Sequence, residues 1–430
     1  MAGALDWERL LSPVRFRLNL DGALLPYTIE ETVPRTPAEA DVQRLVFSAP
    51  FRRLAGKTQV HPFARVDYVH NRLTHSLEVA ETGAGLARTL ALRLGLDDAT
   101  TQACVLHVRA ACLGHDIGNP PYGHAGEFAI RHWVHAHREN LHGLLSQDGE
   151  DASVLGDLEK FDGNAQTFRL LSHPKPRDGA HFRLTCATLG ALIKYPRRAC
   201  DTETAKFSCF RLDEPVFDAV MSELGLRRGP HAWERHPLSY LTEIADDMCY
   251  CVTDCEDALL MGILDEATVR GWYRRLFSPA ARSIADKPSL SIGALRAFLI
   301  GDLMHCFADE LTEAFRHPET LADFERQSPV WQRLKVLKQD YAVVFEDPSK
   351  LRVEIRAQTE LGKTLDCFLK TVRTLRGTLD YDDRCLIRYT FGEAFVQTHR
   401  DRPYGWWLHT MLDFVTGMTD AFLHTFADIL

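Results

Sequence analysis

The densest group of side chains that could do chemistry is the segment GHDIGNPPYGHAGE, residues 114–127. His115 and Asp116 are adjacent and follow an apolar stretch of helical spacing, so the pair could reach one metal ion from two directions. His124 and Glu127 are three residues apart, which places them on one face of a helix that begins there. Because a bonded glutamate orients an imidazole and stabilises its charged form, this pair is typical of a general acid or base.

A second reactive cluster is HNRLTHSLEV, residues 70–79, at the start of an apolar helical pattern. His75 follows Arg72 by three residues, so the two side chains share one side of that helix. The guanidinium of Arg72 could therefore hold a phosphate next to a metal that His75 binds.

The third cluster is EIADDMCYCVTD, residues 243–254. Asp246, Tyr250 and Asp254 follow one another at intervals of four residues. At about 100° per residue each interval drifts by only roughly 40°, so all three side chains line one helix face. Such a row could ligate a metal, stack on a sugar or base, and accept a hydrogen bond from a hydroxyl.

Two imidazoles and two carboxylates, from His75, His115, Asp116 and Asp246, suit a borderline or hard divalent metal that retains water. Such a metal lowers the pKa of bound water and neutralises phosphoryl oxygens, so phosphate-ester hydrolysis is the expected reaction class. A structural alternative exists for each residue. His75 could be a satisfied buried histidine, His115–Asp116 a helix end with its cap, and Asp246 with Asp254 a solvated face. The ordered set favours a site.

Helical periodicity dominates the elements that must position these residues. Helices are predicted over residues 77–90, 97–114, 164–172, 183–195, 214–224 and 237–263, with further long helices within 289–345 and 352–376. The polar and acidic residues 138–163 are interpreted as a connecting segment, and short extended pieces are predicted near 57–61 and 206–212. The expected fold class is all-α, one large helical unit with a C-terminal extension.

The charge balance excludes one broad class of partner. With 50 Lys and Arg against 59 Asp and Glu, the net charge is −9, which excludes a generally basic nucleic-acid binder. The charge is uneven, however: residues 44–88 carry seven basic and three acidic side chains, whereas residues 240–257 carry six acidic and no basic ones. A single site assembled from both segments would combine these opposed fields.

The eleven cysteines form no disulfide-like framework, and the first residues lack the pattern of a secretory signal. No apolar run approaches the length of a membrane span, so the expectation is a cytoplasmic protein that does not contact the membrane. Cys249, Cys251 and Cys255 have no zinc-ribbon spacing, and small buried hydrophobes are their expected role.

The order His75, His115–Asp116, Asp246 resembles that of the HD-domain metal-dependent phosphohydrolases. More narrowly, the chain resembles the dGTP triphosphohydrolase-like enzymes, in register over roughly residues 33–260. The segments that carry this resemblance are FRRLAGKTQV (51–60), NRLTHSLEV (71–79), GHDIGNPPYGHAGE (114–127), FDGNAQ (161–166), LTCATLGALIKYP (184–196), HPLSYLTEIADDMCY (236–250) and DFVTGMTD (413–420).

The resemblance implies an HD-domain helical fold with an N-terminal segment (1–32), a catalytic core (33–285) and a helical region (286–430) that completes the site and makes oligomer contacts. The implied reaction is hydrolysis of dGTP or other deoxynucleoside triphosphates to deoxynucleoside and inorganic triphosphate. The implied cofactor is a divalent metal ion, foremost Mn²⁺ or Mg²⁺, with iron, cobalt, nickel and zinc as alternatives.

Site roles follow from the same resemblance, position by position. It implies that His75, His115, Asp116 and Asp246 bind the metal and that His124, supported by Glu127, protonates the 5′-oxygen of the departing sugar. The resemblance implies that Arg72 binds phosphate, with Arg53 and Lys57 nearby. It implies that the deoxyribose is contacted by Gln59, Tyr250 and Asp254. The other residues implied in the wall of the site are Asn119, Asn164, Lys194 and Lys206.

The family also implies a homo-oligomer, commonly a hexamer, activation by a second nucleotide, and weak binding of single-stranded DNA. The sequence departs from the family pattern at KFSCF (206–210), at Asp162 and at Ala421, which leaves the base preference open. Two other functions stay open as alternatives: another HD-domain nucleotide phosphohydrolase, and a nucleotide-sensing regulatory protein.

Overall fold

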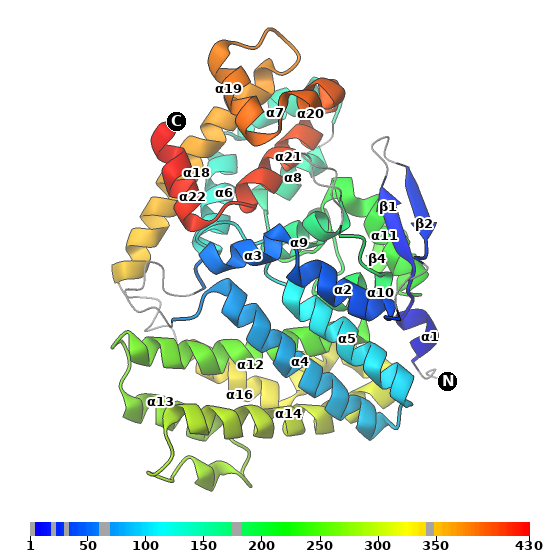
Figure 1. Ribbon diagram of the computed structural model, residues 1–430, viewed down its shortest axis with the longest axis vertical. Helices are drawn as coiled ribbons and strands as arrows, with labels where there is room; N and C mark the ends of the chain where they lie inside the picture. The colour runs from blue at the N-terminus through cyan, green and yellow to red at the C-terminus, as the bar shows by residue number, and fades with distance from the viewer. Residues whose placement is uncertain are drawn as a thin grey trace.

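The computed structural model describes residues 5–18, 23–29, 34–59, 69–150, 152–173, 182–340 and 348–430. Over these ranges the chain is predominantly helical, and its strands form two short hairpins (Figure 1). The predicted all-α class is confirmed. None of the helices described is both long and apolar enough to cross a lipid bilayer.

Three helices form the centre of the larger hydrophobic core: α4 (Arg72–Leu94), α5 (Asp98–Gly114) and α12 (Pro237–Leu260) pack on one another (Figure 1). Side-chain caps set their first residues, because Asn71 accepts from Leu73 N and Asp97 from Thr100 N. Gly83 lets α4 approach α5 closely, since a Cβ there would lie 2.7 Å from Cys112 Sγ.

Further helices surround these three and bury the same core. They are α1 (Trp7–Leu10), α2 (Pro37–Val46), α3 (Ala49–Arg53), α9 (Gly163–Ser172), α10 (Cys186–Leu192), α11 (Glu214–Glu223), α13 (Glu266–Leu276), α14 (Ile292–Arg316), α15 (Phe324–Gln327) and α16 (Pro329–Asp340). Cys249, Cys251 and Cys255 lie buried in this core as free thiols, which fits their predicted role as small hydrophobes.

A second hydrophobic core lies at the top of Figure 1. It joins α6 (His124–Ala136), α7 (Arg138–Ser146) and α8 (Ala152–Glu159) to α18 (Pro348–Thr374), α19 (Tyr381–Thr390), α20 (Glu393–His399), α21 (Tyr404–Thr416) and α22 (Asp420–Ile429). The turn between α5 and α6 therefore passes from one core to the other. The predicted domain boundaries at 33 and 286 stay a prediction.

The strands lie in two antiparallel hairpins. β1 (Arg15–Leu18) pairs with β2 (Leu24–Tyr27), with Arg15 opposite Tyr27, and β3 (Arg227–Gly229) pairs with β4 (Ala232–Trp233). The predicted extended pieces are single bridges, Thr58 with Asn71 and Arg198 with Cys209, while residues 60 and 61 lie outside the described ranges.

The interpretation of residues 138–163 as a connecting segment is wrong, because α7 and α8 occupy most of it. Leu141 and Leu144 of α7 and Leu155 of α8 are buried in the second core. The polar residues that suggested a linker include structural ones: Asp148 accepts bidentate hydrogen bonds from Arg376. Arg376 and the C-terminal helices of the second core are more than 200 residues away in the sequence. The sequence of residues 138–163 alone therefore does not show that its polar and apolar side chains have partners.

The structure predicts that acid destabilises this fold through His236. Its ring is fully buried and caps α12, with Leu238 N donating to Nδ1 and Nε2 donating to Leu10 O. Burial lowers the pKa of His236 to about 4, below the value of about 6.5 expected in an unfolded chain. The unfolded state therefore binds more protons between these two values, and stability falls as the pH falls through that window, by roughly 3 kcal/mol for this group.

Chemical unfolding of the wild type and of His236→Asn at several pH values between 7 and 4 would measure this contribution. We expect the variant to be less stable at pH 7 but to lose stability less steeply toward pH 4. An equal slope in both proteins would contradict the assignment.

Candidate metal and catalytic site

Three segments contain the four predicted metal-binding residues. His75 lies one turn into α4, His115 and Asp116 follow α5, and Asp246 lies on α12. His75 Nε2 is 3.0 Å from Asp246 Oδ1, and His115 Nε2 is 3.6 Å from the same oxygen. Ligand atoms of His75, His115 and Asp246 all lie within 4.8 Å of one another, close enough to share one ion.

The local fold sets which nitrogen of His115 faces this cluster. Its Nδ1 is 2.6 Å from the carbonyl oxygen of Cys112, one turn back in α5, so Nδ1 carries the proton and donates. This bond leaves Nε2 as the nitrogen that points toward Asp246. Burial lowers the pKa of the ring, but Asp116 and Asp246 outweigh it and raise that pKa to about 9, so Nε2 would give up a proton when it binds a metal. An imidazole fixed in this way is a typical metal ligand.

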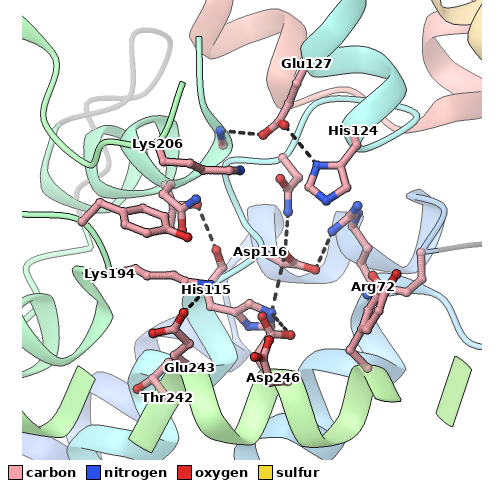
Figure 2. A pocket seen from close by; sticks show the side chains of 18 of the residues that line it. Arg72, His115, Asp116, His124, Glu127, Lys194, Lys206, Thr242, Glu243 and Asp246 are labelled. Carbon is pink, nitrogen blue, oxygen red and sulfur yellow. Dashed lines mark hydrogen bonds and ion pairs between the residues drawn. The ribbon is translucent and has the colours of Figure 1, made fainter. Parts of the chain in front are cut away.

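Asp116, the fourth predicted ligand, lies beside this group of three but outside it, and it links the group to Arg72. Its Oδ1 lies 3.5 Å from His115 Nε2, whereas its Oδ2 accepts a hydrogen bond of 2.6 Å from Arg72 Nη1. Asn119 Nδ2 donates to Oδ1 as well. Figure 2 shows Asp116 between Arg72 and His115, with Asp246 beneath. A predicted metal ligand and the predicted phosphate-binding guanidinium are thus adjacent.

The charges around the cluster favour a bound cation. Burial opposes ionisation of Asp246, but the neighbouring His115 and His75 hold the pKa of its carboxyl well below the usual range. For Asp116, burial is likewise outweighed, chiefly by Arg72, and its pKa is lowered. Both carboxylates therefore stay charged, Asp116 in a buried and Asp246 in a partly buried position, where a divalent ion would neutralise them.

The predicted catalytic pair begins α6. His124 is the first residue of this helix, with 82% of its side chain exposed, and its Nδ1 lies 3.1 Å from Glu127 Oε2. Glu127 is buried, and its Oε1 accepts a hydrogen bond of 2.7 Å from Gly163 N. Burial opposes its ionisation, but the bond from His124 and the charge of Lys206 hold the pKa of Glu127 below its usual range.

A turn with positive φ places this helix start. Tyr122 has φ 64° and Gly123 has φ 57°, a conformation that side chains with a Cβ rarely adopt. A Cβ on Gly123 would lie 2.4 Å from Arg72 Nη2. The glycine therefore allows the Arg72 guanidinium to lie directly below the start of α6.

These groups line a cavity of about 490 Å³ (Figure 2). Of the predicted substrate-binding residues, the cavity wall contains Gln59, Arg72, Asn119, Asn164, Lys194, Lys206 and Tyr250. Lys194 and Lys206 project from the side opposite Arg72, where Glu243 lies 2.9 Å from Lys194 Nζ and Asp162 lies 3.3 Å from Lys206 Nζ. Cationic side chains thus flank the acidic cluster on two sides.

Three predicted contacts lie elsewhere. Asp254 is fully buried one turn beyond Tyr250 and does not contribute to the wall formed by the described residues. Lys57 is also buried, and its Nζ donates to the carbonyl oxygens of Asn119 and Thr416. Arg53 lines a separate cavity with Phe414 and other residues. The basic segment 44–88 therefore reaches the site through Arg72, while its Arg65 lies outside the described residues.

Sequence reasoning missed the part of the wall that comes from the C-terminal half. Lys338 of α16 and Val353 and Glu354 of α18 line the cavity. Lys338 Nζ donates to Asp247 Oδ1 at 2.5 Å and lies 5.2 Å from the centre of the Tyr250 ring. A lone lysine 91 residues from its partner carries no local signal, so only the fold could reveal this contact.

Comparison with known proteins agrees with this geometry. A family model described as the HD domain matches residues 72–159, which contain the first three predicted ligands. The chain is 33% identical to a deoxyguanosinetriphosphate triphosphohydrolase-like protein of Pseudomonas aeruginosa over 97% of each chain. It is also 33% identical to a protein of the same description from Synechocystis sp., over 86% of this chain and 87% of the relative.

A deoxyguanosinetriphosphate triphosphohydrolase of Serratia proteamaculans is 31% identical over 77% of this chain and 76% of its own. These similarities extend well beyond the HD segment, and they include the region that contains Asp246. The chain belongs to the deoxyguanosinetriphosphate triphosphohydrolase-like family of HD-domain proteins.

Proposed function

We propose that this protein is a metal-dependent hydrolase that converts deoxynucleoside triphosphates to deoxynucleoside and inorganic triphosphate. The observation that carries the proposal is one cavity that combines a His–Asp cluster, a His–Glu pair and flanking cations. Its volume of about 490 Å³ is in the range of small-molecule sites. The names of the relatives point to the same substrate class.

We propose His75, His115, Asp116 and Asp246 as the metal ligands, with Mn²⁺ or Mg²⁺ as the ion. Two imidazoles and two ionised carboxylates fit a divalent ion, and Nε2 of His115, which faces Asp246, would provide one of the donor atoms once it loses its proton. When bound, such an ion would supply Lewis-acid stabilisation to phosphoryl oxygens. Arg72 donates to Asp116, one of these proposed ligands, so its guanidinium would lie next to the same phosphate.

His124 is proposed as the general acid. Water adds to the α-phosphorus and releases one proton to the solvent, the bond from phosphorus to the 5′-oxygen breaks, and that oxygen takes a proton from His124. Glu127 accepts the hydrogen bond at Nδ1, so it stabilises the charged imidazole and leaves Nε2 free to face the substrate. The exposure of His124 at the start of α6 gives a substrate access to that nitrogen.

The triphosphate and the sugar are proposed to lie against different parts of the wall. Arg72, Lys194 and Lys206 would neutralise phosphate oxygens, and each is held by an acidic partner. Gln59, Asn119 and Asn164 offer amide groups for the remaining contacts. Tyr250, which lines the cavity, would pack against the deoxyribose and exclude a 2′-hydroxyl.

A substrate panel tests this function. The purified protein would be incubated with each of the four dNTPs, with their mixtures, and with GTP, in Mn²⁺ or Mg²⁺, and the products resolved by ³¹P NMR and anion-exchange chromatography. We expect intact triphosphate and deoxynucleoside, with little product from GTP. A mixture that reacts faster than its components would show activation by a second nucleotide. Release of pyrophosphate with dNMP, or no hydrolysis of any dNTP, would overturn the proposal.

A further inference from the structure

One C-terminal carboxylate joins the two segments that carry the predicted substrate and catalytic residues. Asp420, the first residue of α22, is buried. Its Oδ2 accepts hydrogen bonds from the backbone N–H and the hydroxyl of Thr58, beside Gln59, at 3.0 and 2.5 Å. Its Oδ1 accepts a hydrogen bond of 2.9 Å from Tyr122 N, two residues before His124.

The first of these segments leads directly to the metal cluster. Thr58 pairs with Asn71 as an antiparallel bridge, and Arg72 N donates to Lys57 O. Gly56 lets this segment approach α22, because a Cβ there would lie 2.7 Å from Thr419 Cγ2. Asp420 is therefore connected through Thr58 to the residues that begin α4.

The second segment is the turn that orients His124. Because Tyr122 is held at a φ of 64°, this turn needs external contacts to keep its shape. The Tyr122 hydroxyl donates to Glu360 Oε2 at 2.6 Å, and His424 Nδ1 lies 2.7 Å from Glu360 Oε1. Both ends of the Tyr122 residue are thus bonded to carboxylates of the C-terminal helices.

Residues just before Asp420 also accept hydrogen bonds from segments of the catalytic half of the chain. The Thr416 carbonyl accepts from Lys57 Nζ, and Asp413 accepts from Gln166 Nε2 and from Arg169. Segments that contain three predicted motifs therefore meet at residues 413–424. The signature DFVTGMTD, which contributes no residue to the described wall of the main cavity, lies behind that wall.

We infer that Asp420 is a positioning residue for the proposed reaction: it sets His124 and the segment of Gln59 relative to Arg72 and the metal ligands. The inference rests on the proposed function. A carboxylate suits this role because its two oxygens accept from two separate backbone N–H groups. An asparagine of the same shape has only one accepting oxygen, so one of the two segments would face an NH₂ group instead.

The test uses Asp420→Asn, which conserves shape, and Asp420→Ala. Asp428→Asn is the matched control, since Asp428 is a carboxylate on the same helix whose side chain is 71% exposed. We expect kcat to fall roughly 100-fold in Asp420→Ala, because a small misplacement of a catalytic group can have this effect. We expect Asp420→Asn to lie between it and the wild type, and Mn²⁺ affinity to stay within about twofold. A kcat within twofold of the wild type in both variants would overturn the inference.

A double variant separates positioning from a general loss of structure. Because Asp420 acts partly through His124, adding Asp420→Ala to His124→Ala should lower kcat much less than it does in the wild-type background, with only the effect on the segment of Gln59 remaining. A further loss as large as in the wild-type background would overturn this assignment.

Hydrogen exchange measured without substrate keeps the inference independent of the proposed function. Amides in 57–59 and 120–127 should exchange faster in Asp420→Asn, while those of α5 and α12 keep their protection. Unchanged exchange in both segments would overturn the inference. If the wild type hydrolyses no dNTP but these amides respond, the proposed function fails and the role of Asp420 in positioning stands.

Discussion

Replacing Asp246 by alanine is expected to lower Mn²⁺ affinity by more than roughly 100-fold and to abolish measurable turnover. Residues that only support metal ligands typically contribute 10–100-fold to affinity, so loss of a ligand should exceed that range. Asp246 Oδ1 is the atom nearest to both imidazoles of the cluster, at 3.0 Å from His75 and 3.6 Å from His115. No neighbouring carboxylate among the described residues occupies an equivalent position between the two rings.

The adjacent residue provides the control. Asp247 has the same charge on the same helix, but its oxygens accept from Trp331 Nε1 and Lys338 Nζ. Asp247→Asn should therefore bind Mn²⁺ as the wild type does. Calorimetric titration of metal-free protein would measure both affinities, and thermal unfolding would show that both variants fold. Wild-type Mn²⁺ affinity in Asp246→Ala would remove this residue from the ligand set.

Much of the fold was predictable because local chemistry sets the helix boundaries. Asp97 caps α5, Asp162 caps α9, and Pro237 follows the cap His236 at the start of α12. These ends agree with the predicted helices to within a few residues. The helices α7 and α8 were missed because polar and acidic residues suggested a linker, whereas their buried leucines pack in the second core together with helices from the C-terminal part of the chain.

The site was predictable to the extent that its chemistry lies in short segments. His115 and Asp116 are adjacent in the sequence, and His124 and Glu127 are three residues apart. The members of each pair could therefore be predicted to lie close together without knowledge of the tertiary structure. Lys338 and Asp420 act over distances of 91 and 298 residues to Asp247 and Tyr122. Nothing in the residues around a lone lysine or aspartate indicates which distant backbone it will meet, so such contacts need the tertiary structure.

The uneven distribution of charge along the sequence is also explained by the tertiary structure. Residues 44–88 and 240–257 have opposite charge, and the packing of α4 on α12 brings parts of both segments together. His70 Nδ1 lies 2.8 Å from Asp257 Oδ1, and His75 contacts Asp246 about three turns earlier on α12. The sequence indicated that the two fields belong to one site, whereas the structure shows that Arg72 alone of the described basic residues in 44–88 lines the cavity.

His124→Ala is expected to lower kcat by roughly 10²- to 10⁴-fold while Mn²⁺ affinity stays unchanged, which is the usual contribution of a general acid. The side chain is 82% exposed, and its ring hydrogen-bonds Glu127 rather than any of the four proposed ligands. Removing it should therefore leave both the metal cluster and the hydrophobic cores intact. Glu127→Gln should lower kcat less, because the neutral amide still contacts His124 but stabilises its charged form less well.

The matched control is His135→Ala, an exposed histidine on the same helix that lies outside the described wall of the cavity. It should retain wild-type kcat and KM. The decisive measurement pairs steady-state kinetics on the dNTP found to react best with calorimetric Mn²⁺ binding for each variant. Full turnover in His124→Ala would mean that another group donates the proton. Loss of Mn²⁺ binding in the same variant would mean that His124 is a metal ligand. The expected result separates the two functions of the motif: residues 115 and 116 hold the metal, and residue 124 moves the proton.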